Sequence, residues 1–393
     1  MKTYGLAPAT LAALATLLGP AAAQSQSPAP IQTEKARLSI TRVATGLQHP
    51  WALAVMPGGD VLVTERPGRM RIVRRDGTVS APIAGVPQVA AGRQGGLLDV
   101  TLHPDFASNR MVYFTFSEPA EGGNSTALAR GVLSPDGRAL TAVTVLFSQK
   151  PRVANGMHFG SRVVFDGRGH LYVTLGERFE DRWRVKAQEL DTHLGKIVRL
   201  NEDGSVPADN PFAQRQGALP EIWSYGHRNV QAAAMNPKTG KLWAIEHGPR
   251  GGDEINIPEA GANYGWPVVS FGVNYDGTPV GTGKREAPGM VGPIYQWTPV
   301  IAPSGMLFYS GKAFPAWTGN LLVGGLATKV LVRLELDGDR VVHEERILKE
   351  LGERIRDVAE DADGSLLIVT DEDDGKLVRI APAEGSATGA ARP

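Results

Sequence analysis

A strand, a tight turn and a second strand recur six times along this chain of 393 residues. In each copy, a short run of apolar and β-branched residues leads into a cluster of Gly, Asp, Asn or Pro and then into another such run. The second strands begin near residues 61, 112, 171, 242, 321 and 366, a mean spacing of 61 residues. Such a period predicts one repeated supersecondary unit rather than an irregular fold.

A repeat of this length matches one blade of four antiparallel strands plus a functional loop. We therefore predict an all-β fold, a six-bladed β-propeller of four-stranded antiparallel blades. A β-sandwich or a pair of small barrels is the alternative, but it would need a duplication with a clear linker. No Pro/Ser-rich linker lies between residues 40 and 382. We expect a single propeller domain over residues 38–382, with residues 187–200 as the best helical candidate.

The spacing of the repeats is uneven, with intervals of 51, 59, 71, 79 and 45 residues. The two longest intervals predict long insertions within residues 175–230 and 246–300. Long loops on a rigid scaffold usually carry function. We therefore expect the active or binding site in these insertions.

Composition removes several classes of function. The 41 Lys and Arg residues balance 41 Asp and Glu residues, so the chain lacks the basic surplus that nucleic-acid binding needs. The chain has no cysteine, which excludes disulfides, thiolate zinc sites, Fe–S clusters and a cysteine nucleophile. Walker, H-E-x-x-H, G-x-S-x-G and Rossmann glycine motifs are also absent.

The N-terminus has the pattern of an export signal. Lys2 precedes a short apolar run over residues 6–18, and Ala21-Ala22-Ala23 supplies small residues for cleavage. About thirteen apolar residues are too few to cross the roughly 30 Å core of a bilayer. We predict a signal peptide over residues 1–23, a flexible lead-in over 24–37 and a flexible tail over 383–393. The mature protein should be periplasmic or secreted, without a membrane span.

Two glycine-rich loops precede predicted strands. The first, residues 92–99, holds Gln94 among glycines that would let the backbone approach a ligand. Considered alone, this loop is more simply interpreted as a tight turn between blades. The second, residues 155–160, holds His158, which has a pKa suited to accepting a proton at neutral pH. A structural loop histidine is the plainer interpretation of that residue.

Two further loops are denser in polar residues. Residues 224–231 include Arg228 and Asn229, a planar guanidinium fork beside an amide. An exposed turn is an equally good interpretation. Residues 246–256 combine exposed Gly/Pro backbone with Asp253 and Glu254, the hard oxygen ligands that Ca²⁺ prefers.

The last repeat holds two more charged segments. Arg354 and Arg356 are spaced by two, so they should lie on one face of a strand edge. With Arg228 they could bind a polyanion such as a tricarboxylate, although one-sided surface charge is the simpler interpretation. We interpret the acidic run Asp371-Glu372-Asp373-Asp374-Gly375 as a surface hairpin turn.

Taken together, these segments resemble the soluble PQQ-dependent aldose sugar dehydrogenases of the glucose/sorbosone dehydrogenase family. The likeness runs from about residue 40 to residue 381. The motifs that carry it are Arg93-Gln94-Gly95-Gly96, His158 before Ser161-Arg162-Val163-Val164-Phe165, Gly226-His227-Arg228-Asn229, Glu246-His247-Gly248-Pro249, Asn263-Tyr264-Gly265-Trp266-Pro267 and Arg354-Ile355-Arg356-Asp357-Val358.

The resemblance implies a six-bladed propeller that holds PQQ on its axis over a catalytic Ca²⁺. By resemblance, His158 is the general base for the anomeric hydroxyl of an aldose, and Arg228 stabilises negative charge on the quinone. Gly248 and Pro249 match backbone ligands of the catalytic Ca²⁺, and Glu254 and Tyr264 match a second, structural Ca²⁺ site. The positions that match PQQ contacts are Gln94, Arg228, Asn229, Tyr275, Arg354 and Arg356.

Two positions depart from the family pattern. A lysine found in many relatives is replaced by Ala327, and Lys329 two residues later is the candidate to replace that contact. Met157 precedes the histidine where the glucose-specific branch has an acid, which argues against assuming glucose specificity. The sequence does not identify the electron acceptor, whether a cytochrome, a quinone or a dye. It also does not distinguish a monomer from a homodimer.

Two other functions are compatible with the residues. A Ca²⁺-dependent propeller sugar lactonase would need metal-bound water but no quinone pocket. A non-catalytic propeller that binds a glycan or a protein would have no need of His158. The arginines and Gln94 favour an anionic cofactor instead.

Overall fold

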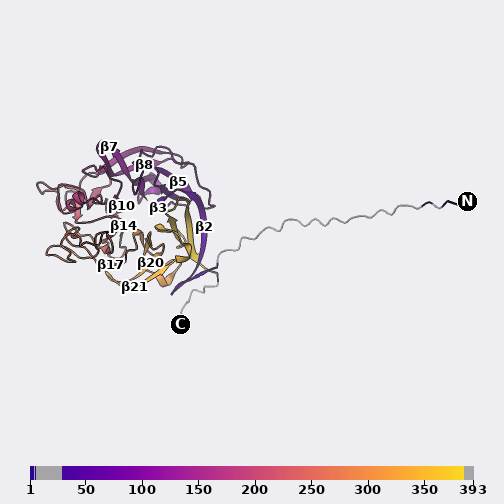
Figure 1. Cartoon of the computed structure of the whole chain (residues 1–393). Coiled ribbons are helices and arrows are strands. Elements are labelled where there is room, and N and C mark those ends of the chain that lie inside the picture. The colour runs from indigo at the N-terminus through magenta and orange to yellow at the C-terminus, as the bar shows by residue number, and fades with distance from the viewer. Residues whose placement is uncertain (4, 6–28, 385–393) are drawn as a thin grey trace, which may run out of the picture.

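The computed structural model describes residues 1–3, 5 and 29–384, and in that part of the chain the strands form six antiparallel sheets. The sheets are arranged as a ring, with β3, β10 and β14 near its centre and β2, β17 and β21 toward its perimeter (Figure 1). The predicted six-bladed β-propeller is confirmed. Each predicted second strand falls in a different sheet, as β4, β7, β11, β15, β19 and β23.

Five blades follow one another along the chain. The first has three strands, β3 (Pro50–Val55), β4 (Val61–Glu65) and β5 (Arg69–Val73). The next is β6 (Leu97–Leu102), β7 (Met111–Ala120), β8 (Gly123–Leu133) and β9 (Leu140–Ser148). The third is β10 (Gly160–Phe165), β11 (His170–Leu175), β12 (Lys196–Asn201) and β13 (Ile222–Tyr225). The fourth is β14 (Val230–Met235), β15 (Leu242–Glu246), β16 (Asp253–Asn256) and β17 (Tyr295–Trp297). The fifth is β18 (Pro303–Phe308), β19 (Leu321–Gly325), β20 (Leu331–Asp337) and β21 (Arg340–Ile347).

The sixth blade joins the two ends of the described chain. Strands β22 (Ile355–Glu360), β23 (Leu366–Thr370) and β24 (Gly375–Pro382) pair with β2 (Arg37–Leu47), which in turn pairs with β1 (Ile31–Gln32). The register from Leu38 opposite Pro382 to Leu47 opposite Gly375 closes the ring with main-chain hydrogen bonds. Closure of this kind leaves no open seam in the ring.

Helices are few and short in the described residues. They are α1 (Phe106–Asn109), α2 (Asp181–Arg184) and the 3₁₀ turns η1 (Val185–Gln188), η2 (Pro315–Trp317) and η3 (Lys349–Leu351). The helix predicted over residues 187–200 is wrong, because Gly195 adopts a positive φ of 65° and the residues after it form β12. Residues 196–200 are buried on both faces of the blade, so their apolar run reflects a buried strand.

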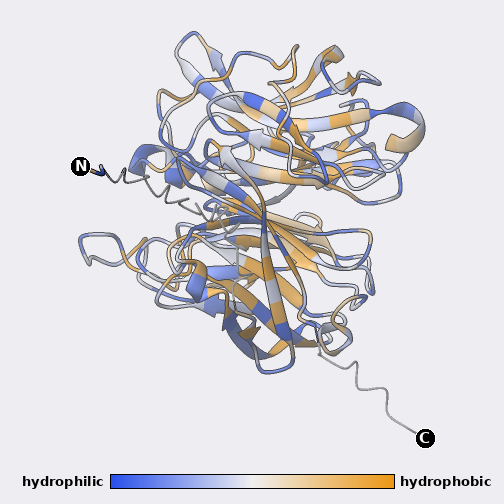
Figure 2. Ribbon diagram, turned by 90° about the vertical axis from the view of Figure 1, so that its right-hand side faces the viewer, coloured by the Kyte–Doolittle hydropathy of each residue, from blue (hydrophilic) through white to orange (hydrophobic). Residues whose placement is uncertain are grey.

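Apolar side chains fill the space between neighbouring blades. One cluster combines Leu62, Phe114 and Phe159 from three successive blades, and another packs Trp317 against Ile355 and Ile380. Hydrophobic residues follow the strands through the body of the ring (Figure 2). Burying each such side chain contributes about 1.5–3 kcal/mol, so packing between blades can hold the ring without disulfides.

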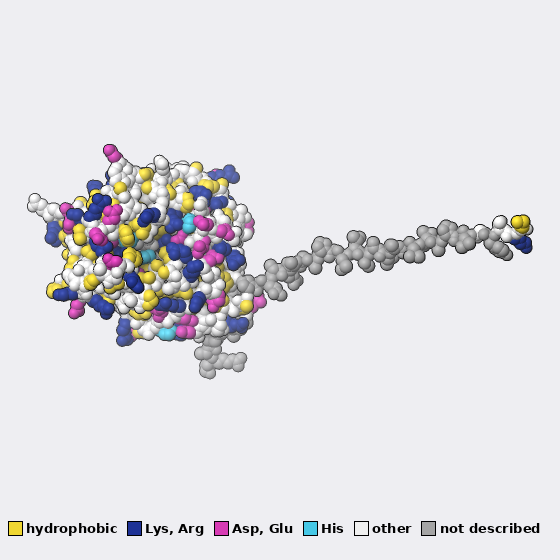
Figure 3. All heavy atoms as spheres, viewed as in Figure 1, with side chains coloured by type: hydrophobic (Ala, Val, Ile, Leu, Met, Phe, Trp, Pro, Cys, Tyr) yellow, Lys and Arg dark blue, Asp and Glu magenta, His cyan; other side chains and the backbone are white. Residues whose placement is uncertain are grey.

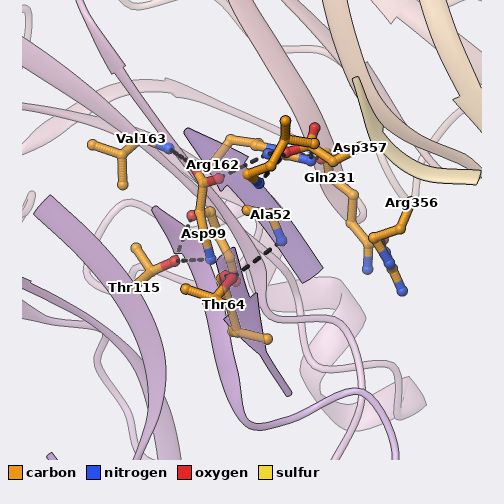
Figure 4. A network of polar contacts seen from close by, with 12 residues as sticks. Ala52, Thr64, Asp99, Thr115, Arg162, Val163, Gln231, Arg356 and Asp357 are labelled. Atoms are coloured by element: carbon orange, nitrogen blue, oxygen red, sulfur yellow. Dashed lines mark hydrogen bonds and ion pairs between the residues drawn. The ribbon is translucent and has the colours of Figure 1, made fainter. Parts of the chain in front are cut away.

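A charged cluster links the innermost strands near the axis. Arg162 on β10 donates to Asp99 on β6 at 2.8 Å and to Asp357 on β22 at 2.9 Å (Figure 4). Its Nε donates to the backbone carbonyl of Gln231 on β14 at 2.8 Å, and Asp357 also accepts from the Leu53 amide on β3. Five of the six blades are therefore tied together by this one ion network.

The ends of the chain lie partly outside the described residues. The predicted signal peptide falls there except for residues 1–3 and 5, as does the tail from residue 385 onward. Within the predicted lead-in, strand β1 is already part of the fold and Thr33 is buried. None of the described helices is long and apolar enough to span a membrane. Acidic and basic side chains are intermingled on the face seen in Figure 3, as the balanced composition predicts.

Candidate active site

The candidate residues gather at one end of the ring because of the strand order within each blade. His158, Asn229 and Arg354 each lie one or two residues before an innermost strand, β10, β14 and β22 respectively. The second strand of each blade runs antiparallel to the first, so its last residue lies at this same end. Residues that directly follow second strands, such as His247, therefore join the site.

His158 is held as a buried, neutral imidazole. The residue is 3% exposed, and its backbone, at a positive φ of 50°, donates to Gln94 Oε1 at 2.8 Å. Its Nδ1 lies 3.1 Å from Glu177 Oε2. Burial lowers the pKa of His158, and nearby Arg228 lowers it further, although Glu177 opposes both.

The protonation of the pair follows from these contacts. Burial alone would raise the pKa of Glu177, but His158 and Arg228 lower it below its usual value. An anionic Glu177 fixes the proton on Nδ1 of His158, which leaves Nε2 as the basic atom of the ring. This arrangement is suited to a general base.

Arg228 and Asn229 place polar groups beside this base. Arg228 is 4% exposed, donates to the carbonyl oxygens of His247 and Gly248 at 3.0 and 2.8 Å, and lies over the ring of Trp266 at 5.2 Å. The Asn229 Oδ1 accepts from the Gly160 amide at 3.0 Å. Arg228 Nε and Asn229 Nδ2 are buried without a hydrogen-bond partner, which is rare in folded proteins and typical of ligand sites.

A series of buried, hydrogen-bonded polar side chains fixes the backbone at Arg228. Glu246 accepts from the Arg228 backbone amide at 2.5 Å and contacts His227 Nδ1 at 2.9 Å. The other ring nitrogen of His227 lies 2.9 Å from Ser224 Oγ. These side chains are almost completely buried, so they serve to fix the loop.

The expected metal ligands line one small cavity beside Arg228. Gly248, Pro249, Glu254 and Tyr264 all contribute to its wall. Burial raises the pKa of Glu254 well above its usual value, and the carboxylates of Glu246 and Asp253 add to the effect. A bound cation would relieve this repulsion.

A cation here would depend on backbone oxygens. In the described part of the chain, no group of three or more His, Asp or Glu side chains is arranged to hold a metal. Main-chain carbonyls with one carboxylate are nevertheless suitable Ca²⁺ ligands. The residues present therefore fit Ca²⁺ better than zinc, which prefers His and Cys.

Arg354 and Arg356 meet at Asp371, where the structure corrects one prediction. The segment 371–375 does join β23 to β24, but Asp371 is 4% exposed and is no surface residue. Its Oδ2 lies 3.0 Å from Arg356 and 3.4 Å from Arg354. Burial lowers the pKa of Arg356 to about 10 although Asp371 opposes the effect, and its Nε has no partner.

The two remaining candidates lie farther out. Tyr275 is 64% exposed, and its ring centroid lies 6.4 Å from that of Phe179, which in turn meets the His158 ring edge-on at 5.2 Å. Lys329 is exposed, and its Nζ donates to the Gly352 carbonyl at 2.8 Å. Tyr275 therefore extends an aromatic wall above the histidine, while Lys329 is engaged by the loop that leads to Arg354.

Sequence reasoning missed several members of this site. Glu177 and Phe179 were not identified, and His247 was quoted within a motif without a role, although each follows the second strand of a blade by one to four residues. The Nε2 of His247 lies 2.6 Å from the Pro303 carbonyl oxygen. Burial lowers the pKa of His247 to about 3, and Arg228 and His158 nearby add to the effect. Its position after a repeat strand is the signal that could have found it.

Fold and site together define a propeller with a buried base, unpaired donors and an arginine cluster at one end of its axis. Comparison with known proteins identifies the family of the chain. The model of the Glucose / Sorbosone dehydrogenase family matches residues 47–379. The chain belongs to this family.

Individual relatives match over nearly their whole length. Aldose sugar dehydrogenase YliI of Escherichia coli is 46% identical over 339 residues, which cover 86% of this chain and 91% of that protein. The crystal structure of the soluble aldose sugar dehydrogenase from Escherichia coli in its apo form has a TM-score of 0.85 at 43% identity, over 88% and 100% of the two chains. The PQQ-bound aldose sugar dehydrogenase of Streptomyces coelicolor has a TM-score of 0.72 at 30% identity, over 88% and 99%.

Proposed function

We propose that this chain is an exported PQQ- and Ca²⁺-dependent aldose dehydrogenase that oxidises an aldose at its anomeric carbon to the lactone. The observation that carries the proposal is the neutral His158 imidazole, paired with anionic Glu177 and set beside buried donors that have no partner in the protein. A base alone would also suit a hydrolase. The unpaired donors and arginines call in addition for an anionic group rich in oxygen.

The residues present fit PQQ, a planar quinone with three carboxylates. Arg354 and Arg356 offer guanidinium groups for the carboxylates, while Asn229 Nδ2 and Arg228 Nε offer donors for carbonyl oxygens. Gln94 accepts from the His158 backbone amide through Oε1, which leaves its amide nitrogen available to a ligand. Ca²⁺ would be held by carbonyls of Gly248 and Pro249, and a structural ion by Glu254 and the Tyr264 carbonyl.

When bound, PQQ with Ca²⁺ supplies a two-electron acceptor whose carbonyl is polarised by the cation. The work of the protein is to move one proton and to exclude water. His158 Nε2 accepts the proton of the anomeric hydroxyl, and Glu177 stabilises the imidazolium that results. The Arg228 guanidinium lies beside this site and stabilises negative charge that develops opposite the base.

Three aromatic residues would confine the sugar. Phe179 packs edge-on against His158, Tyr275 continues that wall outward, and Trp266 lies under Arg228. Flat rings of this kind suit the apolar faces of a pyranose. Neither glucose nor another sugar is selected by these contacts.

The test is reconstitution of the purified apo-protein. With PQQ and Ca²⁺ added, we expect dye reduction with at least one sugar from a panel of aldoses, together with formation of the lactone. Sugar lactone hydrolysis without dye reduction would instead support the lactonase alternative. Absence of both PQQ binding and dye reduction would rule out the dehydrogenase.

A further inference from the structure

A buried carboxylate gathers three arginines beside the site. Asp371 Oδ1 lies 3.0 Å from His49 Nδ1 and 3.6 Å from Arg66 Nη2, while its Oδ2 contacts Arg354 and Arg356. These cations come from two neighbouring blades: His49 directly precedes β3 and Arg66 directly follows β4, while Arg354 and Arg356 lie at the start of β22. Arg66 was not a candidate from sequence.

Asp371 is the one buried carboxylate among these cations, where three guanidinium groups and one histidine face it. Two further carboxylates lie at the edge of the cluster: Glu372 accepts from the Arg354 backbone amide at 3.1 Å, and the exposed Asp373 lies 2.9 Å from His49 Nε2. The cation field is strong enough to hold the pKa of Asp371 well below its usual range although burial opposes it, with Arg356 and Arg66 the largest contributors. Three guanidinium groups that share one buried carboxylate leave positive charge available to a bound anion.

Arg66 is the least satisfied of the three arginines. Its one side-chain contact is the 3.6 Å approach to Asp371, which is too long for a hydrogen bond. Its side chain is nevertheless only 19% exposed. Arg356, by comparison, bonds both Asp371 and Gln231 Oε1.

The backbone of Arg66 is hydrogen-bonded to the loop that carries Gln94. Its backbone carbonyl accepts from the Leu97 amide at 3.1 Å. A Cβ on Gly96, which has a φ of 152°, would lie 1.8 Å from that same oxygen, so glycine is required for the contact. Arg66 therefore lies between the Gln94 loop and Arg356, both candidates for cofactor binding.

We propose that Arg66 is a further cofactor-binding residue, the third guanidinium of a carboxylate-binding face completed by Arg354 and Arg356. The inference rests on the proposed function and extends it by a residue from the first blade. Asp371 gathers the three side chains, and their surplus charge is neutralised by carboxylates of PQQ. The binding face thus spans the junction between the sixth and the first blade.

The test is the Kd of apo-protein for PQQ, measured by fluorescence quenching in the presence of Ca²⁺, for wild type, Arg66→Ala, Arg66→Lys and Arg74→Ala. Loss of one charge-assisted contact should weaken binding about 10- to 100-fold in Arg66→Ala. Arg66→Lys should retain part of the affinity because it keeps the charge. Arg74→Ala is the matched control, since Arg74 is an arginine of the same blade with a similarly loose 3.5 Å ion pair.

The outcomes separate this inference from the proposed function. Weaker PQQ binding in Arg66→Ala, with an unchanged melting temperature and a wild-type Kd in Arg74→Ala, supports it. A Kd for Arg66→Ala within twofold of wild type overturns the inference alone. A rise only in the KM for sugar also overturns it, and failure of wild type to bind PQQ overturns it together with the proposed function.

Discussion

Replacing Glu177 by glutamine tests the His158–Glu177 pair without changing its size. Glu177 is 1% exposed, and its Oε2 is the partner of His158 Nδ1 at 3.1 Å. The variant removes the negative charge that stabilises the imidazolium during proton transfer. A hydrogen bond between charged groups is worth about 1.5–3 kcal/mol, which corresponds to roughly a 10- to 150-fold fall in kcat.

The same variant should shift the pH dependence in a defined direction. Glu177 raises the pKa of His158 against the lowering effect of burial, so its removal lowers that pKa further. The acid limb of the kcat/KM profile should therefore move to lower pH while the plateau falls. A merely structural role for Glu177 would lower the plateau without moving the limb.

The assay is dye reduction by the reconstituted enzyme from about pH 4.5 to 9, with the Kd for PQQ and the melting temperature measured alongside. Glu180→Gln is the control, because Glu180 lies in the same loop but bonds only Asn155 and Arg182 at the surface. A kcat for Glu177→Gln within twofold of wild type, or an acid limb displaced to higher pH, would refute the reasoning.

Three further predictions concern the base, the cation and the axis. His158→Ala should keep its Kd for PQQ but lose about 10²–10⁴-fold in kcat; near-normal turnover would contradict its role. Added Ca²⁺ should raise the melting temperature of wild type but much less that of Glu254→Gln, and equal shifts would place no ion at Glu254. Arg162→Ala leaves Asp99 and Asp357 buried and unpaired, so denaturant unfolding should show a loss of about 3–5 kcal/mol; a loss below 1 kcal/mol would contradict it.

The architecture could be predicted from sequence because short contiguous patterns of residues determine it. Each blade repeats a strand, a turn and a strand, so the number of blades equals the number of repeats. The predictions that were wrong concern segments whose burial depends on contacts with other parts of the fold. Residues 196–200 look helical only while the sheet that buries both their faces is unknown, and the turn at Asp371 looks solvated until the neighbouring blade supplies Arg66.

The candidate site shows the same division. Family motifs led to His158, Arg228 and the candidate metal ligands, which the structure brings to one end of the ring. Their partners Glu177 and Arg66 belong to no such motif. They are recognisable only once the ends of the second strands are known to meet the beginnings of the first.

By itself the sequence determined the repeat, the six blades, the family and the residue types of the chemistry, because these follow from short-range patterns and from motifs contiguous in the chain. Tertiary structure alone decided which charges meet. Arg162 reaches Asp357 across 195 residues, and Arg66 shares Asp371 with two arginines of another blade. Closing a ring brings together positions that no local pattern relates, and burial there determines which imidazole is neutral, which charged groups form ion pairs and which donors stay unpaired.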